Sequence, residues 1–402
     1  MLKNLAAKVK QNNDQLIMTK FSVLQFFFWS SWAILGAYLV YYLTDLGYSN
    51  LEIGSMISLR TFMGLLGPPI VGYICDRLQT RKWIFIFSMF LMALVATPAI
   101  FYGDFLLVLM IGIIGFLWEP QQSVLDSWIL ETSAYTAHNY GFMRAWGSIG
   151  YAIVVTIAGQ VIERFGWTIH FSSYGIIILA VLIVAFKTED KSYDRLKASK
   201  LKSEINQPEE HIIELFKNFD YVFILLISLL IFIPNQMIFI YLAPIIKSVG
   251  GNTADLGYTL FFNALSEAPI FFTAKFFLAK YKTKFLLLFS AFFYLLRFII
   301  AALAVSPVYF IFFGMLQSLS YGVFLVAVRY YVRLVAPENL ITTAQSITLM
   351  AAFGVSGIGG SILGGYLIDG FGTAIMFKVS ISMAATAVFI LLLVVLKEKF
   401  QT

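Results

Sequence analysis

Charged residues are scarce in this sequence. Only 12% of its 402 residues are Asp, Glu, Lys or Arg, whereas ordinary soluble domains carry about 25%. Cys75 is the only cysteine, so no disulfide can form within the chain. Neither a phosphate-binding Gly-Lys-Ser loop nor a zinc-binding His-Glu-x-x-His pattern occurs. These absences argue against a soluble enzyme and against an ATP-driven pump.

Hydrophobic residues are correspondingly abundant. They make up 60% of the sequence, and the mean hydropathy is +0.83. Apolar runs of about 20 residues, long enough to cross a bilayer as a helix, recur along the whole chain. They centre near residues 32, 64, 92, 117, 153, 178, 229, 267, 294, 318, 354 and 386. The alternating ten-residue strands of a membrane barrel do not appear, so we predict an all-α integral membrane protein with twelve transmembrane helices.

A long polar stretch divides these runs into two sets of six. It extends from Lys187 to Lys217 and is rich in Lys and Glu. We therefore predict an amino-terminal six-helix half at 1–187, a cytoplasmic linker at 188–217 and a carboxyl-terminal six-helix half at 218–402. Two such halves are typical of transporters built from repeats, with a binding site at the interface of the repeats.

Lysine and arginine gather on one side of the predicted membrane. If the chain crosses twelve times, the cations of this side are Lys3, Lys8, Lys10, Lys20, Arg77, Arg81, Lys82, Lys280, Lys282, Lys284, Lys397 and Lys399. The loops of the opposite side are nearly free of cations. Because cytoplasmic loops are enriched in Lys and Arg, both termini and the linker are expected in the cytoplasm, with the chain in the cell membrane.

Two opposite charges flank the polar link between the fourth and fifth apolar runs. Asp126 is expected near the end of one helix and Arg144 near the start of the next, at similar depth. Charge at that depth costs at least ~2.5–3.5 kcal/mol per residue and is usually retained for a function. The pair either binds a substrate or locks two helices together. Glu119 lies deeper, and it either lines the same cavity or pairs with Arg60.

The segment Gly72-Tyr-Ile-Cys-Asp76-Arg77-Leu-Gln-Thr-Arg81 follows the second run. It resembles the signature loop of the major facilitator superfamily and stands in the same place. The resemblance implies the major facilitator fold. It also implies that Gly72, Asp76, Arg77 and Arg81 form a gate on the cytoplasmic side.

Further motifs resemble the proton-symporter branch that contains lactose permease, the nucleoside permeases and the phenylpropionate permease. Asp126 followed by Arg144-x-x-Gly-Ser148-x-x-Tyr151 is similar to lactose permease, where the acid and the arginine hold sugar hydroxyls and an aromatic stacks on the ring. The first helix, with Gln25 and Trp29, and the pair Ser266-Glu267 with Leu296-Arg297-Phe298 are similar to the nucleoside permeases. The second helix, with Arg60 before Phe62 and Gly64, is similar to that of the phenylpropionate permease.

The tenth run departs from lactose permease. Gln317-Ser-Leu-Ser-Tyr-Gly322 stands where lactose permease carries His and acid residues for proton transfer. The three histidines, His138, His170 and His211, fall in or beside predicted loops, so a carboxylate is expected to carry the proton. Glu267 with Arg297 nearby fits that role best. Two alternatives are that Glu267 only pairs with Arg297 or only binds substrate.

A hydroxylated ligand needs polar groups with several hydrogen-bonding atoms beside a flat apolar face. Arg144 offers a planar donor fork, Asp126 accepts hydroxyl hydrogens, and Tyr151 or Trp29 can stack on a ring. The full set of expected substrate-binding residues is Gln25, Trp29, Glu119, Asp126, Arg144, Ser148, Tyr151, Asn235 and Gln236.

These observations predict a secondary active transporter rather than an enzyme. We expect a proton-coupled symporter that imports a small hydroxylated solute, a sugar or oligosaccharide, by alternating access. A nucleoside or an aromatic acid is the alternative substrate, and a drug–proton antiporter the alternative mode. The expected partners are the solute, protons and the lipid bilayer, with the chain acting as a monomer and without nucleic acid, metal or other cofactor.

Overall fold

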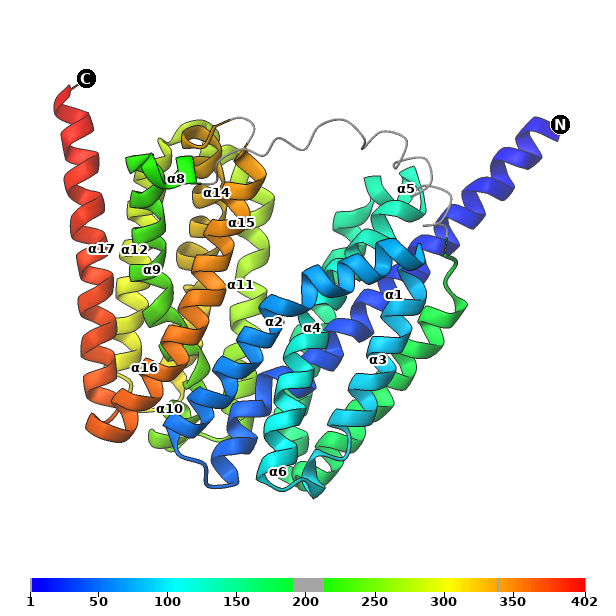
Figure 1. The fold of residues 1–402 in the computed structure, drawn as a ribbon, viewed down its shortest axis with the longest axis horizontal. Helices are drawn as coiled ribbons and strands as arrows, with labels where there is room; N and C mark the ends of the chain where they lie inside the picture. The colour runs from blue at the N-terminus through cyan, green and yellow to red at the C-terminus, as the bar shows by residue number, and fades with distance from the viewer. Residues whose placement is uncertain (1, 191–212, 338–339, 402) are drawn as a thin grey trace. The chain divides into compact units, whose positions relative to one another are not determined.

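Helices make up nearly all of the chain that the structure describes. The computed structural model describes residues 2–190, 213–337 and 340–401, and these ranges contain no strand (Figure 1). Within them, only the backbone is described for residues 2–13, 213, 268–279, 342 and 398–401. The predicted all-α class is confirmed.

The first compact unit comprises residues 1–39 and 59–207. Its elements are α1 (Leu2–Asp45), α2 (Asn50–Leu78), α3 (Lys82–Ala96), the short η1 (Ala99–Phe101), α4 (Asp104–Thr132), α5 (Ala134–His138) and α6 (Tyr140–Lys187). Helix α3 packs against α4 and α6. The short α5 occupies the polar link expected between Asp126 and Arg144, and Ser133 caps its amino terminus through Thr136.

The second compact unit comprises residues 40–58 and 208–402. Its own helices are α8 (Ile213–Lys217), α9 (Phe219–Ile240), α10 (Leu242–Ser248), α11 (Thr253–Lys280), α12 (Thr283–Ala302), α13 (Val308–Met315), α14 (Val323–Val335), α15 (Ile341–Leu349), α16 (Ser356–Phe371) and α17 (Thr373–Gln401). Helix α12 packs against α14 and α17, and α9 packs against α16 and α17. Two π-helical turns, η2 (Ser318–Gly322) and η4 (Met350–Val355), interrupt the helical runs.

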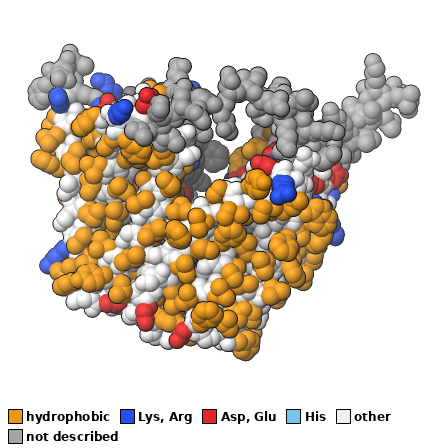
Figure 2. All heavy atoms as spheres, in the orientation of Figure 1, with side chains coloured by type: hydrophobic (Ala, Val, Ile, Leu, Met, Phe, Trp, Pro, Cys, Tyr) orange, Lys and Arg blue, Asp and Glu red, His pale blue; other side chains and the backbone are white. Residues whose placement is uncertain are grey.

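Ten helices in the described part of the chain are long and apolar enough to cross a membrane. One of them, α6, spans 48 residues and bends at Gly166, whose φ of 75° and ψ of −175° are not helical. If α6 crosses twice and α11 crosses once, the number becomes twelve, which stays a prediction. On the face in Figure 2, hydrophobic side chains cover most of each unit, and charged side chains gather mainly toward the helix ends.

The turn between α1 and α2 belongs to the second unit rather than the first. The Asp369 carboxylate of α16 accepts hydrogen bonds from the Asn50 backbone nitrogen at 3.2 Å, from Asn50 Nδ2 at 2.8 Å and from the Leu51 nitrogen at 2.7 Å. An acid at this position satisfies amides that the first turn of α2 leaves without helical partners. Gly54 lies so close to the Ser361 carbonyl that a Cβ would collide with it.

Within the first unit, α2 and α4 approach closely at glycines. A Cβ added at Gly115 of α4 would collide with the Arg60 carbonyl oxygen of α2. One added at Gly64 would lie 2.8 Å from Glu119 Cγ. Because these glycines have no side chains, α2 and α4 pack closely at the level where Arg60 and Glu119 lie.

Candidate functional site

Asp126 and Arg144 lie on successive long helices of the first unit. Asp126 is six residues before the end of α4, and Arg144 is in the second turn of α6. The Asp126 carboxylate interacts electrostatically with Arg144 and accepts hydrogen bonds from Tyr140 and from Gln25 Nε2, the latter at 3.3 Å. The structure therefore brings together Asp126, Arg144 and Gln25, which the sequence analysis expects to bind substrate.

Trp29 of α1 completes this group. Its ring centroid lies 4.1 Å from Arg144 Cζ, and its Nε1 donates to Gln25 Oε1 at 3.1 Å. Gly147 makes the arrangement possible, because a Cβ there would collide with Trp29 Cδ1. Stacking on an indole holds a guanidinium flat and leaves its N–H groups pointing sideways. We call Gln25, Trp29, Asp126 and Arg144 the Trp29 set.

An aromatic stack packs against Trp29 of this set. Trp118 of α4 lies between Phe28, at 4.6 Å between centroids, and Trp32, at 4.2 Å, with both rings nearly parallel to it. Its ring also meets Trp29 edge-on at 6.1 Å. The sequence analysis missed Trp118, because in a chain with 40 Phe and 21 Tyr no spacing distinguishes one aromatic from another.

The remaining expected substrate residues, apart from Glu119, lie on α6 and α9. Ser148 is exposed on α6, and Tyr151 interacts electrostatically with Tyr38. Asn235, 9% exposed, and the half-buried Gln236 lie on α9 of the second unit. Their roles stay predictions.

Glu267 lies in a polar cluster of the second unit. Gln317 Nε2 donates to Glu267 Oε1 at 3.0 Å, and Arg297 interacts electrostatically with the same carboxyl. Arg297 is fully buried and donates from Nε to the Phe313 carbonyl and from Nη1 to Ser320 Oγ, each at 3.0 Å. Its Nη2 has no hydrogen-bond partner. Ser320 belongs to the π-helical turn η2, a form often found at functional sites.

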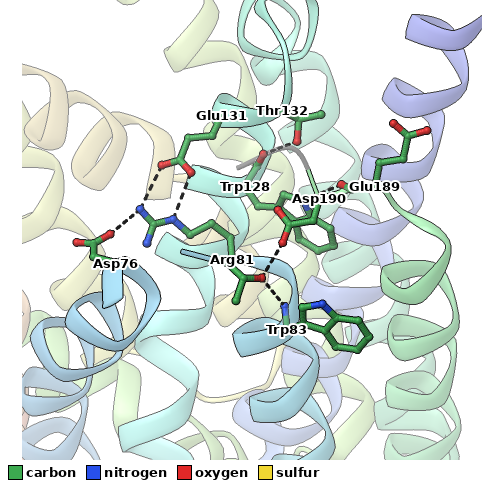
Figure 3. A network of polar contacts seen from close by, with 9 residues as sticks. Asp76, Arg81, Trp83, Trp128, Glu131, Thr132, Glu189 and Asp190 are labelled. Atoms are coloured by element: carbon green, nitrogen blue, oxygen red, sulfur yellow. Dashed lines mark hydrogen bonds and ion pairs between the residues drawn. The ribbon is translucent and has the colours of Figure 1, made fainter. Parts of the chain in front are cut away.

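The gating residues partly converge on Arg81 (Figure 3). Arg81 Nη2 lies 2.9 Å from Asp76 Oδ1, and its Nε lies 3.3 Å from Glu131 Oε2. Burial by itself lowers the pKa of the Arg81 guanidinium. The hydrogen bond and charge of Glu131, a hydrogen bond with Cys75 and the charge of Asp76 outweigh it, so the pKa is raised above its ordinary value. Arg77 is exposed. Gly72 lines a hollow of about 180 Å³ with Asp76 and Arg81.

Thr80 of the α2–α3 link, Lys82 of α3 and Trp128 of α4 form hydrogen bonds with the segment that follows α6. Thr80 Oγ1 donates to Asp190 at 2.6 Å, and Trp128 Nε1 donates to the Glu189 carbonyl at 3.0 Å (Figure 3). Lys82 Nζ donates to the Thr188 carbonyl at 2.7 Å. A cation at the carboxyl end of a helix satisfies carbonyls without helical partners.

The reasoning from histidine placement is wrong in one respect. His170 lies beside the bend at Gly166, but its side chain is 1% exposed inside α6, with Nε2 3.0 Å from the Ile34 carbonyl oxygen and no partner for Nδ1. The sequence analysis placed His170 beside a loop, because an evenly apolar run gives no sign of which of its residues are buried. A carboxylate is therefore not the only titratable group within the spans. His211 lies outside the described residues.

Comparison with known proteins identifies the family. A model of the MFS_1-like family matches residues 18–379. The chain is 24% identical over 368 residues to a maltose permease of Geobacillus stearothermophilus, covering 90% of each. It is 26% identical over 306 residues to a sucrose permease of Escherichia coli, covering 72% of this chain and 71% of that one.

Solved structures share the fold. A point mutant of the nucleoside transporter NupG superimposes with a TM-score of 0.79 at 18% identity, over 94% of this chain and 99% of that one. The peptide transporter POT, in complex with sulfate, gives a TM-score of 0.73 at 14% identity, over 95% of this chain and 94% of that one. The predicted major facilitator membership is confirmed. The chain belongs to the MFS_1-like family of major facilitator transporters.

Proposed function

We propose that this transporter imports a sugar or oligosaccharide together with protons, by alternating access. The observation that carries the proposal is the Trp29 set, in which Arg144 Cζ lies 4.1 Å from the centroid of the Trp29 ring and Asp126 accepts a hydrogen bond from Gln25. The N–H donors of a guanidinium and the oxygens of a carboxylate suit the many hydroxyl groups of a saccharide. The similarity to maltose and sucrose permeases supports this substrate class.

Proton coupling is assigned to Glu267. Its carboxyl accepts a hydrogen bond from Gln317 Nε2 and interacts electrostatically with the buried Arg297. A neighbouring cation favours a charged carboxylate, whereas loss of that neighbour in a dry environment favours the neutral acid. A rearrangement that changes the distance from Glu267 to Arg297 would therefore bind or release a proton.

A nucleoside is the second candidate substrate. The residues Ser266-Glu267 and Leu296-Arg297-Phe298 resemble nucleoside permeases. The chain is also 25% identical over 189 residues to the nucleoside permease NupG of Escherichia coli, which is 42% of each chain. An indole beside hydrogen-bonding groups suits a nucleobase as well as a sugar ring.

We assign the cytoplasmic gate to the loop around Arg81, supported by its contacts with Asp76 and Glu131. The protein works as a monomer in the cell membrane with both termini in the cytoplasm. The bias of Lys and Arg supports this orientation, and reporter fusions at each terminus test it.

Transport into proteoliposomes tests the function. The purified protein is reconstituted, a pH gradient is imposed, and uptake of maltose, sucrose, glucose, uridine and phenylpropionate is compared. We expect accumulation of a saccharide that collapses when a protonophore dissipates the gradient. Accumulation of uridine alone would favour the nucleoside candidate, and stimulation by sodium without pH dependence would contradict proton coupling.

A further inference from the structure

A second group, on α1, α2 and α4, repeats the chemistry of the Trp29 set. Arg60 Cζ lies 5.3 Å from the ring centroid of Trp32, one helical turn after Trp29 on α1. Arg60 in turn interacts electrostatically with Glu119, two turns before Asp126 on α4. Each group therefore combines an indole, a guanidinium and a carboxylate. We call Trp32, Arg60 and Glu119 the Trp32 set.

Glycines make room for both indoles. A Cβ at Gly36 would collide with the Trp32 ring, just as one at Gly147 would collide with Trp29. Trp118 stacks on Trp32 at 4.2 Å and meets Trp29 edge-on, so one buried ring fixes both indoles. Such support on rigid helices is what a preorganised binding site requires.

Neither Arg60 nor Glu119 is fully buried. The Glu119 side chain is exposed and Arg60 is half-buried, although both lie near the middle of helices long enough to cross the membrane. None of the salt bridges found among the described side chains joins Arg60 to Glu119. Exposed charges at mid-helix, close enough to attract one another but not bonded, are typical of the wall of a polar cavity.

The balance of charge indicates the kind of ligand. The two sets together contain two guanidinium groups and two carboxylates, so their formal charges cancel. Such a wall suits a neutral molecule with many hydroxyl groups better than an anion or a cation, because each hydroxyl can donate to a carboxylate and accept from a guanidinium.

The spacing indicates the length of the ligand. Along α1, Trp29 and Trp32 are three residues, or ~4.5 Å, apart; along α4, Asp126 and Glu119 are seven residues, or ~10 Å, apart. A single pyranose ring held by the Trp29 set does not extend over two turns of α4. Two linked rings do.

We propose that the Trp32 set is a second saccharide subsite, so that the transporter prefers a substrate of at least two linked sugar rings over a monosaccharide. The Trp29 set holds one ring, and Arg60 and Glu119 hold hydroxyl groups of the next. This inference rests on the proposed sugar transport. It adds the number of sugar rings in the substrate and the residues that bind the second ring.

Binding of a disaccharide compared with a monosaccharide tests the subsite. Purified full-length protein is titrated with maltose, sucrose, lactose and glucose by calorimetry, as wild type and as the Arg60→Gln and Glu119→Gln variants. Arg60→Lys keeps the charge without the fork and serves if Arg60→Gln folds poorly. Arg164→Gln and Glu163→Gln, exposed at the bend of α6, are the matched controls.

We expect the wild type to bind at least one disaccharide about tenfold or more tighter than glucose, as one or two hydrogen bonds to charged groups imply. Arg60→Gln and Glu119→Gln should reduce the ratio of disaccharide affinity to glucose affinity toward one, whereas the controls should keep the ratio of the wild type. An equal affinity of the wild type for glucose and all three disaccharides would overturn the subsite, as would an unchanged preference in both variants. Failure of the wild type to bind any of these sugars would instead refute the proposed function.

Discussion

Arg144 and Asp126 can be tested as ligand-binding groups by neutralising them separately and together. Arg144 lies over Trp29 at 4.1 Å and presents charged donors beside Asp126. Replacing it by Gln removes a charged partner from the ligand, a loss of about 1.5–3 kcal/mol in binding free energy, or about 10- to 150-fold in Kd. Asp126→Asn should cost a similar amount, because it removes the charged acceptor of hydroxyl hydrogens.

Stability should respond differently from binding. In the Arg144→Gln variant the Asp126 carboxylate keeps its hydrogen bonds from Gln25 and Tyr140. The destabilisation is therefore expected near ~1–3 kcal/mol, below the 3–5 kcal/mol typical of a fully buried pair that loses one partner. The double variant Asp126→Asn/Arg144→Gln removes both charges, so the melting temperature should return toward that of the wild type.

The double variant decides between a binding pair and a structural pair. Saccharide affinity is measured by calorimetry and melting by intrinsic fluorescence, with Arg164→Gln as the exposed control. If both residues contact the ligand, the double variant binds no better than either single variant although it is stable. If it binds within about twofold of the wild type, the pair only holds α4 and α6 together and the reasoning is refuted.

Three other changes probe separate parts of the molecule. Glu267→Gln should abolish accumulation driven by a pH gradient while substrate exchange between equal concentrations persists, because only net transport needs the proton. Arg81→Gln should leave Glu131 without its ion pair, lower stability by about 1–2 kcal/mol as judged by melting, and slow transport. Asp369→Asn removes the charge at the first turn of α2, worth about 0.5–1 kcal/mol, so the Leu51 amide should exchange hydrogen several-fold faster.

The first two of these changes have a matched control, and each of the three has an outcome that would contradict it. Glu163→Gln, an exposed position on α6, should leave accumulation intact; equal accumulation in Glu267→Gln would remove the proton role of that residue. Arg77→Gln, whose side chain is exposed, should change melting far less than Arg81→Gln, and equal melting of the two would contradict the network. Unaltered exchange at Leu51 would show that Asp369 does not cap α2.

The features predicted from sequence are those carried by local patterns. Apolar runs predict the helices, and adjacent residues around Gly72 predict the segment at the end of α2 and in the link to α3 that contains the Asp76–Arg81 ion pair. Asp126 and Arg144 could be paired because only a short link separates their helices. In these cases neighbours in sequence are neighbours in space.

Contacts between distant segments leave no such pattern. Glu131 meets Arg81 across 50 positions, and Gln317 meets Glu267 across 50. The depth at which His170 is buried depends on the packing of α6 against α1, which no periodicity in an evenly apolar helix reveals. Gln317 had one available signal, since it replaces the titratable residues that lactose permease carries in that helix.

The turn between α1 and α2 has a consequence for any attempt to divide the molecule. Residues 40–58 are joined covalently to the amino-terminal helices, yet they pack within the carboxyl-terminal unit. Cutting the chain in the central linker would therefore not produce two self-sufficient pieces. The amino-terminal fragment would lack the Asp369 carboxylate that α2 needs at its first turn, and the carboxyl-terminal fragment would expose the glycine-rich surface of α16 where that hairpin rests.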